Sequence, residues 1–298
     1  MLVEARSGAS EAEPADIVGA FDARARRFET PCGDGVMVWR VWGNGEPLVL
    51  GHGAQGAWSH WIRNIDALAA TRMVIAPDLP GYGESAMPRS EDHAAICEAL
   101  VNGVEHILGE GQPVDMAGFS FGGVAFAWFA SYHPEIVRRL VLVGTGGLDT
   151  PMGHVDLRRI GGLVGEERRA AMKANLLGLM LHAPDSADDL AMHLLVLNGK
   201  RSRLAPTPLV LPDRLLEVLP RVDAQIGAIW GEFDRPHPNP PAQEAVLRRF
   251  QPDVDFRVIA GAGHWVMYEK PEAFNAALIA MLDAPLGTGR ITERTSPR

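Results

Sequence analysis

The stretch that decides the fold is Gly118-Phe119-Ser120-Phe121-Gly122, a G-x-S-x-G pentapeptide near the middle of the chain. It follows a strand-like run at residues 113–117 and precedes a helix-like run at 124–130. A strand that turns directly into a helix holds the serine in a strained backbone conformation, and glycines on either side keep the two elements from colliding. The five letters alone could belong to a glycine-rich loop, but this context predicts a nucleophilic Ser120.

A serine nucleophile needs a base and an acid that orients the base. In proteins built around this turn, the acid and then the histidine follow the serine along the chain. Two buried strand-like runs, residues 225–230 and 256–259, each end in a turn that carries one of these groups. We predict that Asp234 orients the imidazole of His264 and that His264 takes the proton from Ser120.

Two other carboxyl groups compete with Asp234 for this role. Glu232 lies two residues before it, and Asp149 follows the strand-like run at residues 140–143. An acid at either position could also reach the histidine, so both stay open as alternatives.

The main-chain donors for a developing oxyanion are predicted in a second turn. A short apolar run at residues 47–50 leads into the small-residue turn 51–58. The N–H of Ala54 in this turn can face the N–H of Phe121 at the start of the helix, and a pair of such donors stabilises negative charge on oxygen. His52, inside the same turn, is expected to brace the loop rather than act as a base.

These motifs together resemble the α/β-hydrolase superfamily, over about residues 35–283. The resemblance implies an α/β fold with a mostly parallel central sheet flanked by helices and a helical cap insertion. The motifs are the His52-Gly53 turn, the segment 78–85, the serine turn, residues 231–234, and Gly263-His264-Trp265.

The domain organisation expected from this pattern has four parts. They are an N-terminal extension at 1–30, a core formed by 31–148 and 223–285, a helical cap at 149–222, and a flexible tail at 286–298. The cap is expected because the alternation of strand and helix stops there. The sequence instead predicts helices at 165–177 and 186–197.

Within the superfamily, a cap at this point roofs the active site and sets the substrate. We predict substrate contacts from Leu177 and Met180 in the cap and from Trp265 beside the histidine. The apolar character of this region indicates a substrate with a sizeable apolar part.

The nearest members by resemblance are the capped meta-cleavage-product hydrolases, enol-lactonases and small carboxylesterases. Two features depart from the first group: Phe119 stands where asparagine is usual, and His193-Leu194 where an arginine holds the substrate carboxylate. Arg201 or Arg203 could substitute for that arginine.

We therefore predict a serine hydrolase of EC class 3.1.1 or 3.7.1. It would cleave an ester or related acyl bond of a small, partly apolar substrate through an acyl-enzyme. The alternatives are carbon–carbon hydrolysis of a meta-cleavage-type dienoate, a non-catalytic ligand-binding member of the fold, and a cofactor-free oxygenase or perhydrolase.

Composition narrows the remaining classes. The chain has 298 residues, is 47% hydrophobic and carries a net charge of −9, so it can bury a full core and lacks the basic balance of a nucleic-acid binder. No apolar run spans a membrane and no secretion signal is evident. Two cysteines, Cys32 and Cys97, fit a reducing cytoplasm. We expect no metal and no cofactor, a small-molecule substrate, and leave a homo-oligomer open.

Overall fold

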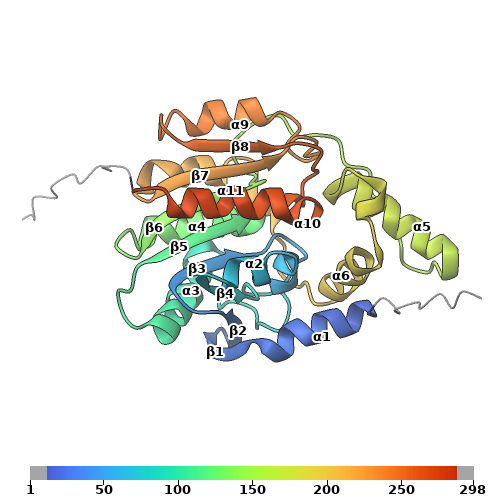
Figure 1. Cartoon of the computed structure of the whole chain (residues 1–298), viewed down its shortest axis with the longest axis horizontal. Helices are drawn as coiled ribbons and strands as arrows, with labels where there is room; N and C mark the ends of the chain where they lie inside the picture. Colours follow the sequence, from blue (N-terminus) through green and yellow to red (C-terminus); the bar gives the residue numbers. More distant parts are fainter. Residues whose placement is uncertain (1–11, 287–298) are drawn as a thin grey trace, which may run out of the picture.

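Within residues 12–286, which the computed structural model describes, eight strands form one sheet in the order β1-β2-β4-β3-β5-β6-β7-β8 (Figure 1). The strands are β1 (Arg26–Cys32), β2 (Gly35–Trp42), β3 (Glu46–Gly51), β4 (Arg72–Pro77), β5 (Val114–Phe119), β6 (Val137–Val143), β7 (Gln225–Gly231) and β8 (Asp255–Ile259). Strands β3 to β8 run parallel, whereas β2 pairs antiparallel with β1 and β4. The predicted mostly parallel sheet is confirmed.

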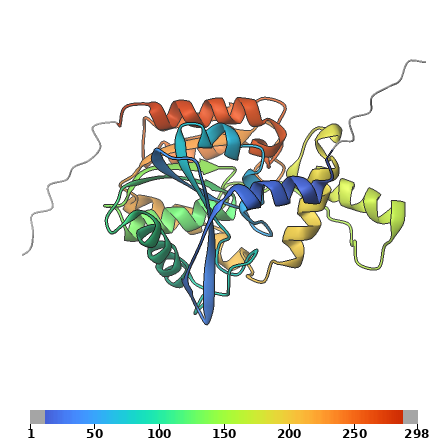
Figure 2. The same ribbon diagram turned by 60° about the horizontal axis from the view of Figure 1, so that its bottom comes forward.

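Helices cover both faces of this sheet (Figure 2). One face carries α3 (His93–Leu108), α4 (Phe121–Tyr132) and α9 (Pro240–Leu247). The other carries α2 (Ile65–Ala69) and α11 (Pro271–Asp283), and the short α10 (Val266–Glu269) leads into α11.

Successive side chains along a strand point to opposite faces of the sheet. In β6, Leu140 and Leu142 belong to the buried cluster that includes α3 and α4, while Val141 and Val143 belong to the cluster that includes α11. Because helices bury both faces, these strands are apolar throughout. This explains why the sequence shows continuous apolar runs rather than alternation.

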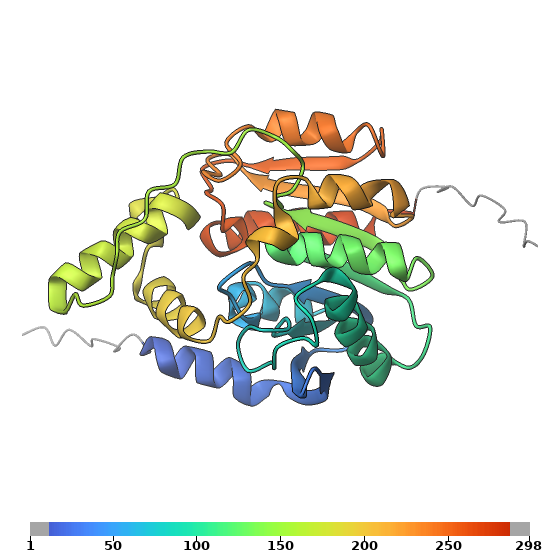
Figure 3. The same ribbon diagram turned by 180° about the vertical axis from the view of Figure 1, so that it is seen from behind.

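Between β6 and β7 the chain forms an inserted helical segment. Its helices α5 and α6 stand apart from the sheet (Figures 1 and 3). The segment contains α5 (Gly165–Asn175), a π-helical turn η2 (Leu176–Met180), a 3-10 turn η3 (Pro184–Ser186), α6 (Asp189–Lys200), α7 (Thr207–Val210), α8 (Arg214–Val218) and a 3-10 turn η4 (Leu219–Arg221). Helix α6 begins at Asp189, inside the predicted helical stretch 186–197, because the Asp188 carboxylate accepts from the Ala191 N–H at 2.8 Å and caps the helix there.

The N-terminal part departs from the expected boundary. Helix α1 (Pro14–Arg24) runs alongside α6 (Figure 3), and its apolar side chains pack against the same cluster as the inserted segment. The predicted end of the extension at residue 30 falls inside β1, because this strand pairs with β2 from Arg26 onward. Of the predicted tail at 286–298, residues 287–298 lie outside the described residues.

Candidate active site

Ser120 lies at the turn between β5 and α4. Its φ is 51° and its ψ is −116°, a region that non-glycine residues rarely adopt. The turn is held by the Ser120 N–H, which donates to Val143 O at 2.8 Å. A Cβ on Gly118 would lie 2.5 Å from the Gly122 carbonyl oxygen, so only glycine fits there. The backbone of this turn therefore holds Ser120 at the carboxyl end of β5.

The turn after β3 packs directly against the serine turn. A Cβ on Gly122 would lie 2.6 Å from His52 O, and a Cβ on Gly53 would lie 2.9 Å from the Phe119 ring. Such contacts need glycine on both sides. They bring Ala54, just after Gly53, next to the serine turn.

His52 fixes the direction of one main-chain donor. Its Nε2 accepts from the Leu79 N–H at 2.9 Å, so the proton is on Nδ1, which donates to Gly53 O at 2.7 Å. Burial lowers the pKa of His52 and keeps the ring neutral. Because a trans peptide directs its C=O and N–H to opposite sides, this bond aims the Ala54 N–H away from His52.

The other predicted donor is the N–H of Phe121, the first residue of α4. The first N–H groups of a helix have no acceptor within the helix, and the helix dipole adds partial positive charge there. Both Ala54 and Phe121 line the same cavity as Ser120.

Asp234 and His264 form a buried pair at the ends of β7 and β8. The His264 Nδ1–Asp234 Oδ2 distance is 2.8 Å, and Asp234 is fully buried. The other carboxylate oxygen of Asp234 accepts from the His237 N–H at 2.9 Å. Because a carboxylate accepts at Nδ1–H, the Nε2 atom of His264 is left as the bare nitrogen.

The two alternative acids lie elsewhere. The Glu232 carboxylate is exposed and accepts from the Gly261 N–H at 2.9 Å. Asp149 is also exposed, at the position after β6 where its φ is 52°. The His264 ring nitrogen pairs with neither of them.

A cavity of about 290 Å³ opens beside Ser120 and His264. Its polar side chains are those of Ser120, His264, His237 and Thr207. Among the described residues that line it, none is Arg, Lys, Asp or Glu. The remaining lining residues are Ala54, Phe119, Phe121, Gly146, Met152, Leu179, Met180, Pro206, Val210, Leu211 and Pro236.

Of the three predicted substrate contacts, the structure places only Met180 on this cavity. Leu177 packs instead within the cluster shared by the inserted segment and α11. The reason is the π-helical turn, in which the Leu181 N–H donates to Leu176 O five residues back, so that residues three apart no longer share a face. Trp265 is buried, donates to His60 O at 2.9 Å and stacks on Tyr268.

Several lining residues escape sequence reasoning. Met152, Pro206 and Leu211 belong to connecting stretches that show no periodic pattern. One feature of the sequence could have pointed to His237: it lies three residues after the predicted acid, Asp234. Arg201 and Arg203 do not line the cavity: Arg201 lies 3.4 Å from the Glu84 carboxylate, and Arg203 donates to Ser85 O.

One carboxylate ties the inserted segment to the histidine loop. The buried Glu269 accepts from the N–H groups of His182 at 2.9 Å, Ala183 at 2.6 Å and Gly263 at 2.6 Å. Gly263 immediately precedes His264, and its Cα packs on the backbone of residues 180–182. Glu269 therefore holds the two segments in contact.

Replacing Glu269 with glutamine should lower the free energy of unfolding by about 2–3 kcal/mol, because an amide cannot accept from all three donors and the –NH₂ group faces an N–H. Urea denaturation measures the loss. The exposed Glu272, in the first turn of α11, provides the control, and Glu272→Gln should stay close to wild type. Equal stability of the two variants would contradict a linking role for Glu269.

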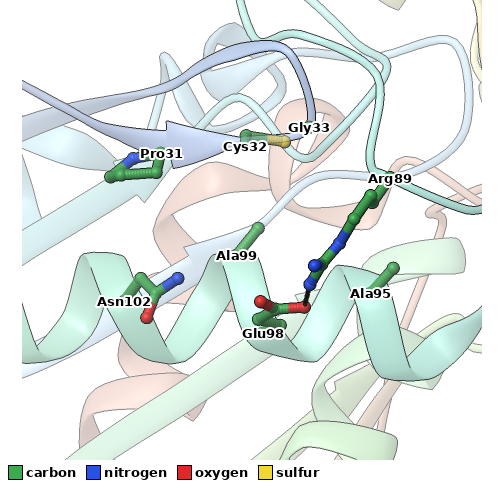
Figure 4. A pocket seen from close by; sticks show the side chains of 8 residues that line it. All are labelled: Pro31, Cys32, Gly33, Arg89, Ala95, Glu98, Ala99 and Asn102. Carbon is green, nitrogen blue, oxygen red and sulfur yellow. Dashed lines mark hydrogen bonds and ion pairs between the residues drawn. The ribbon is translucent and has the colours of Figure 1, made fainter.

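A second, smaller pocket of about 200 Å³ lies between β1 and α3 (Figure 4). Arg89 and Glu98, which line it, form an ion pair with each other. Burial raises the pKa of the Cys32 thiol to about 11, which makes it a poor nucleophile. Among the described residues that line this pocket there is no histidine or serine to act beside Cys32. Across the described residues, no three His, Cys, Asp or Glu side chains are arranged to hold a metal ion, and no helix has the length and apolarity to cross a membrane.

Comparison with known proteins agrees with this geometry. Residues 48–277 match the model of the alpha/beta hydrolase family. The chain therefore belongs to this family and is a hydrolase, as the motifs predicted.

The chain is 31% identical over 257 residues to a 2-hydroxy-6-oxononadienedioate/2-hydroxy-6-oxononatrienedioate hydrolase of Burkholderia vietnamiensis, covering 80% of this chain and 87% of that protein. It is 28% identical over 262 residues to a 2-hydroxy-6-oxo-6-phenylhexa-2,4-dienoate hydrolase of Burkholderia cepacia, covering 80% and 88%. Its structure is similar to that of an esterase from Rhodococcus sp. ECU1013, with a TM-score of 0.72 and 24% identity over 88% of this chain and 99% of that chain.

Proposed function

We propose that this protein is a serine hydrolase that cleaves an ester or related acyl bond of a small, uncharged and largely apolar substrate. The observation that carries the proposal is the convergence of Ser120, the buried His264–Asp234 pair and two main-chain donors on one cavity without charged walls.

The proposed reaction begins when Ser120 Oγ attacks the carbonyl carbon and His264 Nε2 takes its proton. Asp234 holds the imidazole in the required tautomer and stabilises the imidazolium. The N–H groups of Ala54 and Phe121 receive the oxyanion, and a donor of this kind contributes about 3–4 kcal/mol to transition-state stabilisation. His264 then protonates the leaving group. Water, activated by the same histidine, releases the acyl group from Ser120.

The walls of the cavity favour a neutral substrate. Moving a carboxylate from water into an apolar site without a partner cation costs several kcal/mol. Arg201 and Arg203, the two arginines that the sequence offered for a substrate carboxylate, are engaged with the loop at Glu84 and Ser85 instead. An ester or lactone with an uncharged acyl part meets no such cost.

Carbon–carbon hydrolysis is the second candidate, since the named relatives act on dienoates. The same serine, histidine and oxyanion donors suit that reaction too. Against it stands the absence of Arg or Lys among the described residues that line the cavity, because a dienoate brings a carboxylate. A non-catalytic ligand-binding role is disfavoured by the cost of keeping a buried His–Asp pair without a use for it.

The inserted segment serves, in this proposal, as a cap over the cavity, corresponding to the expected range 149–222. Leu179, Met180, Thr207 and Val210 all belong to it and line the cavity. We also propose a cytoplasmic location, because Cys32 and Cys97 are buried free thiols, which suits a reducing compartment.

A substrate panel on the purified protein tests the function. We expect turnover of p-nitrophenyl esters with neutral acyl chains, persistence of that activity after EDTA dialysis, and inactivation by an organophosphate that labels Ser120 on peptide mapping. Turnover confined to a ring-fission dienoate would select carbon–carbon hydrolysis instead. Inertness toward both classes, with no labelling, would reject the proposal.

The cap makes a separate prediction about chain-length preference. Met180→Ala should enlarge the cavity and raise the kcat/KM ratio of p-nitrophenyl hexanoate to acetate about tenfold, since one methylene in an apolar pocket is worth roughly 1–3 kcal/mol. Leu177→Ala is the matched control, because Leu177 lies three residues away and off the cavity. It should lose stability and keep the wild-type ratio. A shift of the ratio in both variants, or in neither, would contradict this assignment.

A further inference from the structure

The cavity wall contains a second imidazole that the proposed reaction does not use. His237 lies three residues after Asp234, and its ring centroid is 5.6 Å from that of His264. Its own N–H donates to Asp234 Oδ1 at 2.9 Å. The bond that anchors the backbone of His237 thus belongs to the same carboxylate that orients His264, so the backbone at His237 is held next to the His264–Asp234 pair.

The His237 ring is enclosed but unpaired. The residue is 5% exposed, and within residues 12–286 neither ring nitrogen forms a hydrogen bond with protein. Gly146 provides the space for the ring, since a Cβ there would lie 3.1 Å from His237 Cε1. Buried polar groups in proteins are nearly always hydrogen-bonded. Because His237 lines the cavity and no protein group pairs with its ring, the ring nitrogens are available to a group that enters the cavity.

The ring is neutral under ordinary conditions. Burial lowers the pKa of His237 to about 4, the nearby Asp234 opposes this, and the proximity of His264 adds to it. A neutral imidazole offers one N–H donor and one bare nitrogen acceptor. It recognises a neutral oxygen or hydroxyl group and provides no charge for a carboxylate.

His237 is not a second general base. A general base of this kind needs a carboxylate at its other ring nitrogen to stabilise the imidazolium. Both oxygens of Asp234 already accept hydrogen bonds, one from His264 Nδ1 and the other from the backbone N–H of His237. A positive charge on His237 would also oppose the imidazolium that forms on His264. Its chemistry is that of a fixed hydrogen-bonding group in an otherwise apolar wall.

We propose that His237 determines specificity by hydrogen-bonding a neutral oxygen on the substrate, and that the preferred substrates are esters or lactones with an ether, hydroxyl or carbonyl oxygen close to the scissile carbonyl. This inference rests on the proposed hydrolysis at Ser120. Apart from the reacting residues, the described lining residues include two polar side chains, Thr207 and His237. Thr207 is exposed, so His237 is the buried polar side chain of this wall.

Two esters of equal chain length test the proposal. In p-nitrophenyl methoxyacetate an ether oxygen replaces one methylene of p-nitrophenyl butyrate, and the intrinsic reactivity of the pair cancels when enzyme variants are compared. In His237→Leu the kcat/KM ratio of methoxyacetate to butyrate should fall about tenfold relative to wild type, which is the effect of one neutral hydrogen bond. His237→Asn, which keeps a donor and an acceptor, should retain part of the preference.

The control is Met152→Leu, which changes the shape of the same wall without changing its polarity and should keep the wild-type ratio. An unchanged ratio in His237→Leu, with butyrate still hydrolysed, overturns the role of His237 and leaves the hydrolase function standing. No turnover of either ester by wild type overturns both. If His237→Leu does not fold, as judged by circular dichroism, the ratio in His237→Phe decides in its place.

Discussion

Replacing Ser120 with alanine should reduce kcat by a factor of thousands or more and leave the fold intact, as expected when a triad nucleophile is deleted. The fold should survive because the hydroxyl makes no capping bond to α4, and the strained backbone is held by the surrounding glycines rather than by the side chain. Steady-state kinetics on the best ester of the panel measure the loss, with circular dichroism and thermal melting as checks of folding.

Ser131→Ala gives the matched control for this experiment. Ser131 lies on the same helix, and its hydroxyl donates to Trp128 O at 2.8 Å, away from the cavity. It should keep wild-type kcat. A Ser120→Ala protein that is folded and retains more than about a tenth of wild-type activity is incompatible with a serine nucleophile, since triad deletions cost far more.

The site could be predicted from the sequence where the chemistry is local. The serine turn is specified by glycines within two residues of Ser120, and each of them fits a contact that a Cβ would close. Asp234 and His264 each follow an apolar strand directly. Parallel strands end at the same edge of a sheet, so residues placed after them meet without any information from distant contacts.

The cavity was harder to predict because its walls come from segments without a repeating pattern. Pro206, Leu211 and Met152 lie on connections whose path depends on the packing of the whole inserted segment. Leu177 and Met180 were predicted together from the apolar character of this region, which gives no sign of the π-helical turn at Leu176–Met180. Periodicity predicts which face of a regular helix is buried and fails where hydrogen bonding changes register.

The boundary of the first strand was also set by pairing that a local pattern does not show. The largely polar residues 1–30 were predicted to form an N-terminal extension, yet β1 begins at Arg26. Edge strands carry charged residues on exposed positions, so the pattern of an edge strand is close to that of a surface segment. Pairing with β2, not composition, decides the boundary.

Asp234→Asn should lower kcat by a factor on the order of 10⁴ while the cavity keeps its shape. The asparagine carbonyl oxygen is expected to take the place of Oδ1, because the His237 N–H can only donate. The amide –NH₂ group then faces His264 Nδ1 and donates to it. The imidazole must carry its proton on Nε2 in that state, so it cannot accept the proton of Ser120.

Asp149→Asn is the control for the acid, because Asp149 occupies the other position from which a carboxylate could serve and is exposed. It should be almost fully active. The measurement is kcat for both variants across pH 6–9. Within this range the loss in Asp234→Asn should persist, because raising the pH does not return His264 to the tautomer with the proton on Nδ1. If Asp234→Asn loses less than about tenfold while Asp149→Asn is crippled, the acid lies after β6, and the buried His264–Asp234 pair serves only to hold the histidine loop.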